Sequence, residues 1–71
     1  MDYRGIVNQW PDAGAMASDA VVRPVVVAQW KHRNTIPARY WGRLLQGARQ
    51  RRIAVTIDDF LEAAEHRANG A

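Results

Sequence analysis

The sequence predicts an all-α fold, a compact domain of four or five helices with room for one short extended segment near residues 53–57. Three observations lead to this prediction. Apolar residues recur at helical spacing in the second half of the chain, helix-start residues precede these stretches, and no cysteine is present to build a disulfide framework. A chain of 71 residues is short enough for one domain, so residues 1–71 are treated as a single unit.

The first third of the chain is expected to hold two short helices separated by the tripeptide WPD. Pro11 disfavours helical geometry at Trp10, which ends the first helix. Asp12 is a favourable N-cap residue for a second helix that runs through Asp19. This second helix is expected to turn three apolar side chains inward: Met16, Ala17 and Ala20.

The stretch VVRPVVVAQWKHR, residues 21–33, is rich in valine and has the propensity of a strand. We nevertheless predict a helix opened by Arg23 and Pro24, because proline suits a first helical position and Val27 and Trp30 lie three residues apart. Together with the preceding helix, it forms a helix-turn-helix over about residues 12–33. The exposed face of its second helix is then expected to carry Arg23, Val25, Ala28, Gln29 and His32.

Two further helices are predicted at about residues 37–51 and 57–67. Pro37 suits the start of the first, whose apolar stripe consists of Trp41, Leu44, Leu45 and Ala48. Thr56 and Asp59 resemble a capping box at the start of the second, whose apolar stripe consists of Ile57, Phe60, Leu61 and Ala64. All three tryptophans are expected in the core, because a small domain needs their large apolar area.

Charge is distributed unevenly along the chain. Eight of the ten Lys and Arg residues lie between Arg23 and Arg52, and four acidic residues follow them: Asp58, Asp59, Glu62 and Glu65. The net charge of +3 suits an anionic partner. The longest apolar run, residues 25–28, is far too short to cross a bilayer, so we expect no membrane partner and a cytoplasmic location.

The segments AMASDAVV and QWKHRNTIPARYW resemble those of small Cro-like and YdaS-like helix-turn-helix regulators of bacterial phages and prophages. The resemblance spans roughly Ile6 to Arg67. It implies a λ-repressor-like helical domain that binds double-stranded operator DNA as a homodimer, represses transcription and associates with the nucleoid. Val21 stands where the family usually has glycine, so either the turn is reshaped or the correspondence shifts along the chain.

If the second helix of this unit enters the major groove, its residues have distinct expected roles. Arg23 and Gln29 would form hydrogen bonds with base edges, and Val25 and Ala28 would contact thymine methyl groups. Five cationic or titratable side chains would contact phosphates: Lys31, His32, Arg33, Arg39 and Arg43. The run ARQRR is more typical of a solvated helix end.

The alternative is a small protein-interaction module, such as an antitoxin, adaptor or inhibitor, that uses the face of Val25 and Val26. A homodimer would be formed by the helix at residues 57–67, or by strand pairing of the segment IAVTI assisted by packing of Phe60 or Leu61. We expect no enzyme, no cofactor and no metal site, because the sequence has no nucleophile with a recognisable base, no glycine-rich phosphate loop and no cluster at metal-ligand spacing.

Overall fold

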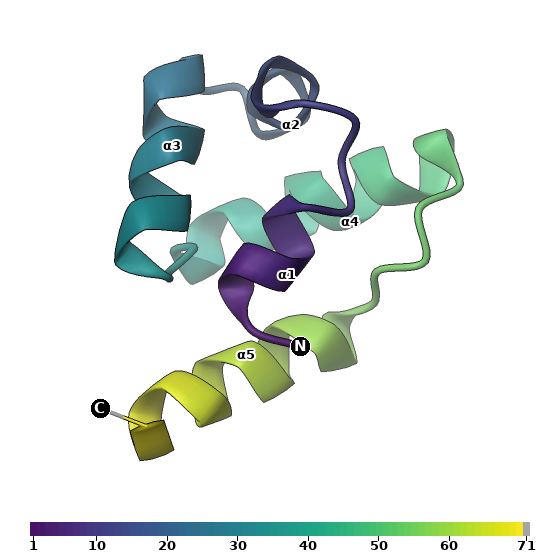
Figure 1. Ribbon diagram of the computed structural model, residues 1–71. Coiled ribbons are helices and arrows are strands. Elements are labelled where there is room, and N and C mark those ends of the chain that lie inside the picture. Colours follow the sequence, from purple (N-terminus) through teal and green to yellow (C-terminus); the bar gives the residue numbers. More distant parts are fainter. Residues whose placement is uncertain (71) are drawn as a thin grey trace.

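A computed structural model describes residues 1–70, with side chains described through Ala68. It contains α1 (Tyr3–Val7), α2 (Ala13–Ala20), α3 (Pro24–Arg33), the 3-10 turn η1 (Ala38–Tyr40), α4 (Trp41–Arg51) and α5 (Ile57–Gly70) (Figure 1). The predicted all-α fold is confirmed. No strand occurs within residues 1–70, and the expected extended segment near residues 53–57 is an irregular link whose last residue already opens α5.

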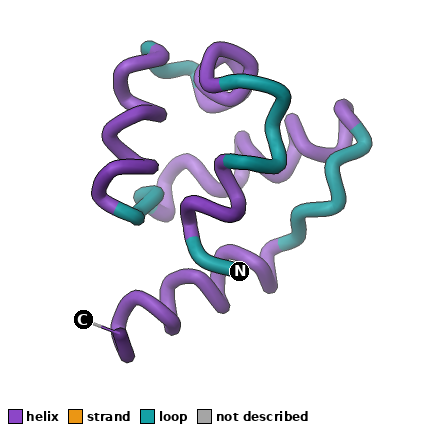
Figure 2. Tube along the Cα trace, in the orientation of Figure 1, coloured by secondary structure: helices purple, strands orange, loops and turns teal. Residues whose placement is uncertain are grey.

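The helices enclose one core, and α1 lies between the α2–α3 pair and α5 (Figure 1). α2 packs against both α3 and α4, while α1 packs against α3 and α5. Short connections join α1 to α2 and α2 to α3, as the tube in Figure 2 shows. The largest fully buried side chains come from every part of the chain: Ile6, Met16, Val27, Ile36, Leu44 and Phe60.

Three helices end in a left-handed residue that is not glycine. Val21, Asn34 and Arg52 have φ angles of 61°, 52° and 60°, at the ends of α2, α3 and α4. In each case the N–H of the following residue donates back across the last turn, in the pattern of a Schellman motif. The three bonds are Val22 N to Ala17 O at 3.0 Å, Thr35 N to Trp30 O at 3.0 Å and Ile53 N to Ala48 O at 2.8 Å.

The second half of the chain corrects three predictions. Pro37 has the extended ψ of 139° and precedes a 3-10 turn, so the α-helix begins at Trp41 rather than near residue 37. Ile57 and Leu61, expected inside, are 46% and 53% exposed. Ala63 shares the buried stripe of α5 with Phe60 instead, because α5 packs on α1 and α4 with that side only.

The tryptophans are confirmed as core residues with one difference. Trp10 and Trp30 are both 4% exposed, whereas Trp41 is only half-buried at the edge of the core. Its ring lies 5.2 Å from that of Phe60, centroid to centroid, and its indole Nε1 donates to the Ile36 carbonyl at 2.8 Å. Trp41 therefore ties the loop before η1 to α5.

Candidate nucleic-acid interface

Helix α3 forms despite its valines because tertiary contacts hold its inner face. Arg23 is its N-cap, with extended backbone, and Pro24 opens the first turn with a φ that suits a helix. Val27 and Trp30 are 1% and 4% exposed against α1 and α2, and this burial outweighs a weak helical propensity. Val26 is only partly exposed and packs against the core, so it does not share the outer face proposed for it together with Val25.

The turn before α3 contains a left-handed residue that is not glycine. Val21 takes the left-handed conformation with φ 61° and ψ 48°, and its side chain is 73% exposed. A β-branched residue there carries a conformational cost of about 1–2 kcal/mol. The left-handed turn therefore forms with valine at this position, at that conformational cost.

The outer face of α3 is exposed as predicted. The side chains that we expected on this face are all exposed: Arg23, Val25, Ala28, Gln29 and His32. Val25 is 56% exposed, so it contributes little to the core. Arg23 makes no capping hydrogen bond with its side chain, which leaves its guanidinium available to a ligand.

Two predicted cations from outside α3 lie next to the helix-turn-helix unit. Arg43 on α4 donates from Nη1 to the carbonyl of Ala20 at 3.4 Å, which places its guanidinium beside the turn. The Cζ atom of Arg39 lies 5.0 Å above the ring of Tyr40, and that ring lies 5.1 Å from Trp30. Both arginines are exposed. The contacts with Ala20 and Tyr40 hold them beside α2 and α3.

The nine predicted residues do not form a single cluster. Lys31 is exposed on the flank of α3 that faces the α1–α2 connection, where it lines a shallow hollow with Asn8 and Asp12. Arg33 lies at the last position of α3, and its carbonyl accepts a hydrogen bond from Arg67 at 3.0 Å. The candidate interface therefore comprises the outer face of α3, its C-terminal turn, and two arginines on η1 and α4.

Among the described residues, no cation of this candidate interface forms an ion pair with a carboxylate. Among the described residues, the ion pairs are Arg51 with Asp19 and the N-terminal amine with Glu62. Neither pair involves an arginine or lysine of the predicted interface. Uncompensated, exposed cations attract a polyanion over a distance of about one Debye length.

Two arginines at the C-terminal end of α3 could not be identified from the sequence. Arg4 donates from Nε to the Lys31 carbonyl at 2.9 Å and from Nη2 to the His32 carbonyl at 3.3 Å. Arg67 donates to the carbonyl of Arg33, as described above. These bonds satisfy the last carbonyls of α3 and place positive charge at the negative end of its dipole. No local sequence signal connects residues so far apart.

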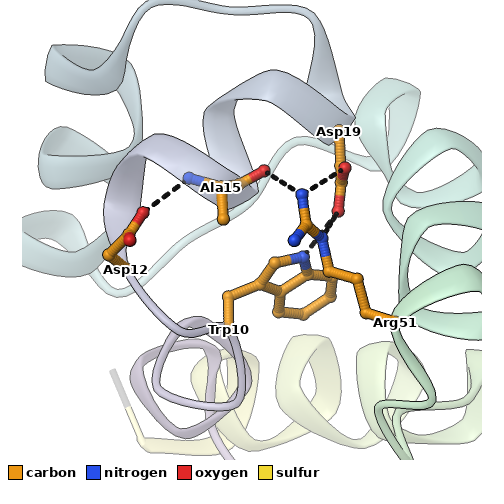
Figure 3. Close-up of polar contacts among 5 residues, drawn as sticks. All are labelled: Trp10, Asp12, Ala15, Asp19 and Arg51. Carbon is orange, nitrogen blue, oxygen red and sulfur yellow. Dashed lines mark hydrogen bonds and ion pairs between the residues drawn. The ribbon is translucent and has the colours of Figure 1, made fainter.

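A polar cluster around Asp19 fixes α2 on its neighbours (Figure 3). The Asp19 carboxylate accepts hydrogen bonds from the Trp10 indole at 2.8 Å and from Arg51 Nε and Nη2 at 2.7 and 3.1 Å. The Arg51 hydrogen bonds hold the pKa of Asp19 below its usual value; burial opposes this shift, and the bond from Trp10 adds to it. Arg51 is therefore a structural residue, although its run of basic residues was interpreted as a solvated helix end.

Gly47 permits the close approach of α2 and α4 at this cluster. A Cβ atom at position 47 would overlap the Asp19 carboxylate, whereas a Cβ at Gly42 on the same helix would meet nothing within 4 Å. Gly47 is also buried. The orientation of the helix-turn-helix unit on α4 thus depends on the absence of a side chain at this position.

No protein-family profile, curated protein or solved structure matches this chain. Within residues 1–70, no three His, Asp or Glu side chains gather closely enough to hold a metal ion. No helix in that part of the chain combines the length and apolarity needed to cross a membrane. Function is therefore inferred from the geometry of the helix-turn-helix unit and its charges.

Proposed function

We propose that this protein binds specific double-stranded DNA sequences through α3 and regulates transcription, as a homodimer that occludes a promoter. The observation that carries the proposal is the outer face of α3, which is exposed along its length and is flanked by cations without carboxylate partners. An exposed helix with such a face fits the major groove of B-form DNA. The resemblance to small Cro-like and YdaS-like regulators agrees with this proposal.

Three side chains of the outer face of α3 would read the bases. Arg23 can donate two hydrogen bonds to guanine O6 and N7, and Gln29 can pair with adenine N6 and N7. Val25 offers an apolar contact to a thymine methyl group, which gives a 56% exposed valine a role. The proposed readout therefore combines two polar contacts with one apolar contact in each half-site.

The surrounding cations would position α3 on the DNA backbone. Arg39 and Arg43 lie on η1 and α4, beside the helix rather than on it, where phosphate contacts are expected. If about four cations of each subunit contact phosphates, the logarithm of affinity should fall with the logarithm of salt with a slope of roughly −7 for a dimer. Two half-sites would lie about 34 Å apart on a pseudo-palindromic operator.

The test is selection of bound duplexes from a random pool at two salt concentrations, followed by affinity measurements on the enriched sequence. We expect a two-fold symmetric motif that survives the higher salt. Arg23→Ala and Gln29→Ala should each relax the preference at one position of the half-site, at a cost of about 1–3 kcal/mol. Arg39→Ala should weaken all duplexes alike and lower the salt slope.

Arg52→Gln is the matched control for these variants. Arg52 is an exposed arginine at the C-terminal cap of α4, at the far end of the helix from Arg43. Its loss should change specific binding little. Weak binding that is uniform across sequences and disappears with salt would contradict the proposal. A partner protein whose binding depends on Val25 but not on Arg39 would favour the interaction module instead.

A further inference from the structure

A second apolar surface lies where α4, the link at residues 53–56 and α5 meet. Ile57 and Leu61, one turn apart on α5, are 46% and 53% exposed. Ile57 also lines a hollow beside them, whose other lining residues are Leu45, Arg49, Ile53, Ala54, Val55 and Thr56. Two projecting side chains thus stand next to an apolar hollow that could accept similar side chains.

Charges of both signs border this surface. Arg49 borders the hollow and is exposed. Asp58 and Glu65 are exposed and, at three residues before and four residues after Leu61, flank it on α5. The surface therefore has an apolar centre and is bordered by charges of both signs.

We propose that this surface, which we call the α4–α5 surface, binds a second copy of this chain around a two-fold axis. In a two-fold contact each copy presents the same surface, so a projection must meet a hollow and a cation must meet a carboxylate of the other copy. The α4–α5 surface contains both members of each complementary pair. Ile57 and Leu61 of one copy would enter the hollow of the other, with Arg49 opposite Asp58 and Glu65.

The same charges disfavour other occupants. Asp58 and Glu65 repel the phosphates of nucleic acid, and a partner of a single charge sign would be repelled by one side of the surface. The inference rests on the homodimer part of the proposed function, for which it supplies the contact. Phe60, one of the two contacts expected from the sequence, is 0% exposed in the core and does not take part.

The first test is sedimentation velocity of the full-length chain without DNA over a range of concentrations. We expect reversible dimers for the original sequence, and a dissociation constant raised about a hundredfold or more by Leu61→Glu, since two buried leucines are lost in each dimer. Val25→Asp is the matched control, because Val25 is exposed to a similar extent on α3. It should leave the dimer unchanged while it weakens DNA binding.

The second test uses charge reversal to show that the partner is another copy. Arg49→Glu alone and Glu65→Arg alone should each weaken dimerisation by about two- to fivefold, because each places like charges opposite one another. An equimolar mixture of the two variants should associate more tightly than either alone, since the opposite charges face each other again in the mixed dimer. Thermal unfolding of each variant verifies that its exposed substitution leaves the fold intact.

Two results would overturn the inference. One is a chain that remains monomeric at the highest concentration, and the other is a dimer that Leu61→Glu does not weaken. Dimers that form in this way without any specific DNA binding would leave the inference standing and contradict only the DNA-binding part of the proposed function. If the chain binds DNA specifically as a dimer and Leu61→Glu does not weaken that dimer, the DNA-binding proposal stands and the inference about the α4–α5 surface is contradicted.

Discussion

The inner and outer sides of the α2–α3 pair differ in what their side chains contact. On the inner side Asp19 accepts three hydrogen bonds, and Val27 and Trp30 are buried. On the outer side Val25 is 56% exposed, and Arg23 makes no capping contact. Folding requires the inner side chains but not the outer ones, so substitutions on the two sides should separate stability from ligand binding.

The largest effect should come from the outer side. Val25→Asp places a carboxylate where the proposed interface meets DNA, and we expect the affinity for the selected duplex to fall on the order of a hundredfold. The free energy of unfolding should change little, because the side chain is exposed. Fluorescence anisotropy with a labelled duplex and thermal unfolding measure the two quantities. If Val25→Asp lowered the free energy of unfolding but left DNA affinity unchanged, Val25 would belong to the inner side, which supports folding, and not to the outer side.

The inner side should respond in the opposite manner to Gly47→Ala. The new Cβ would overlap the Asp19 carboxylate, so we expect the free energy of unfolding to fall by about 1–3 kcal/mol. Gly42→Ala is the control on the same helix, where the Cβ meets open space and the better helical propensity should add up to about 1 kcal/mol. Urea denaturation measures both. Equal effects of the two substitutions would contradict a close approach at Gly47.

A smaller effect is expected at the turn that connects α2 and α3. Val21→Gly should raise the free energy of unfolding by about 1 kcal/mol, because glycine adopts a φ of 61° without the strain of a β-branched side chain. Asn34→Gly, at another left-handed position, should change it by only a few tenths of a kcal/mol, since asparagine tolerates this conformation. Calorimetric unfolding that ranks the two substitutions the other way would show that Val21 is not strained.

The smallest effect should be a pH dependence of the folding stability that Asp19 contributes on the inner side. The pKa of Asp19 is lowered in the folded state by its hydrogen bonds with Arg51, so its contribution to stability is present above the pKa of the unfolded state. This contribution is lost as the pH falls below about 4 and towards the lowered folded pKa. The melting temperatures of the original chain and of Asp19→Asn should therefore converge on acidification. Parallel curves from pH 7 to pH 2 would contradict this linkage.

Much of the helical framework was accessible from local sequence patterns. Asp12 caps α2 because its carboxylate accepts a hydrogen bond from the Ala15 amide at 2.7 Å, and the Asp59 carboxylate accepts one from the Thr56 amide at 2.8 Å, as the capping signals predicted. Both signals act over three residues, so they are readable without knowledge of the fold. The exposed face of α3 followed from helical periodicity in the same way.

Surface positions of α5 were harder to predict because periodicity does not reveal how far a helix is covered. Ile57 and Leu61 belong to the apolar stripe in sequence, but only the side of α5 near Phe60 packs against α1 and α4. A stripe on an amphipathic helix is wider than the area that its neighbours cover. The exposed remainder became visible only in the folded chain, and it is the basis of the proposed dimer contact.

The sequence by itself determined the all-helical class, the helix-turn-helix segment and the concentration of positive charge in the middle of the chain, because propensity, capping and periodicity act between near neighbours. The tertiary structure decided which long-range pairs form. Arg51 meets Asp19 across 32 residues, and Arg4 reaches the end of α3 across 27 and 28 residues. Such contacts depend on how helices cross, and that depends on burial and close approach, as at Gly47, rather than on any local pattern.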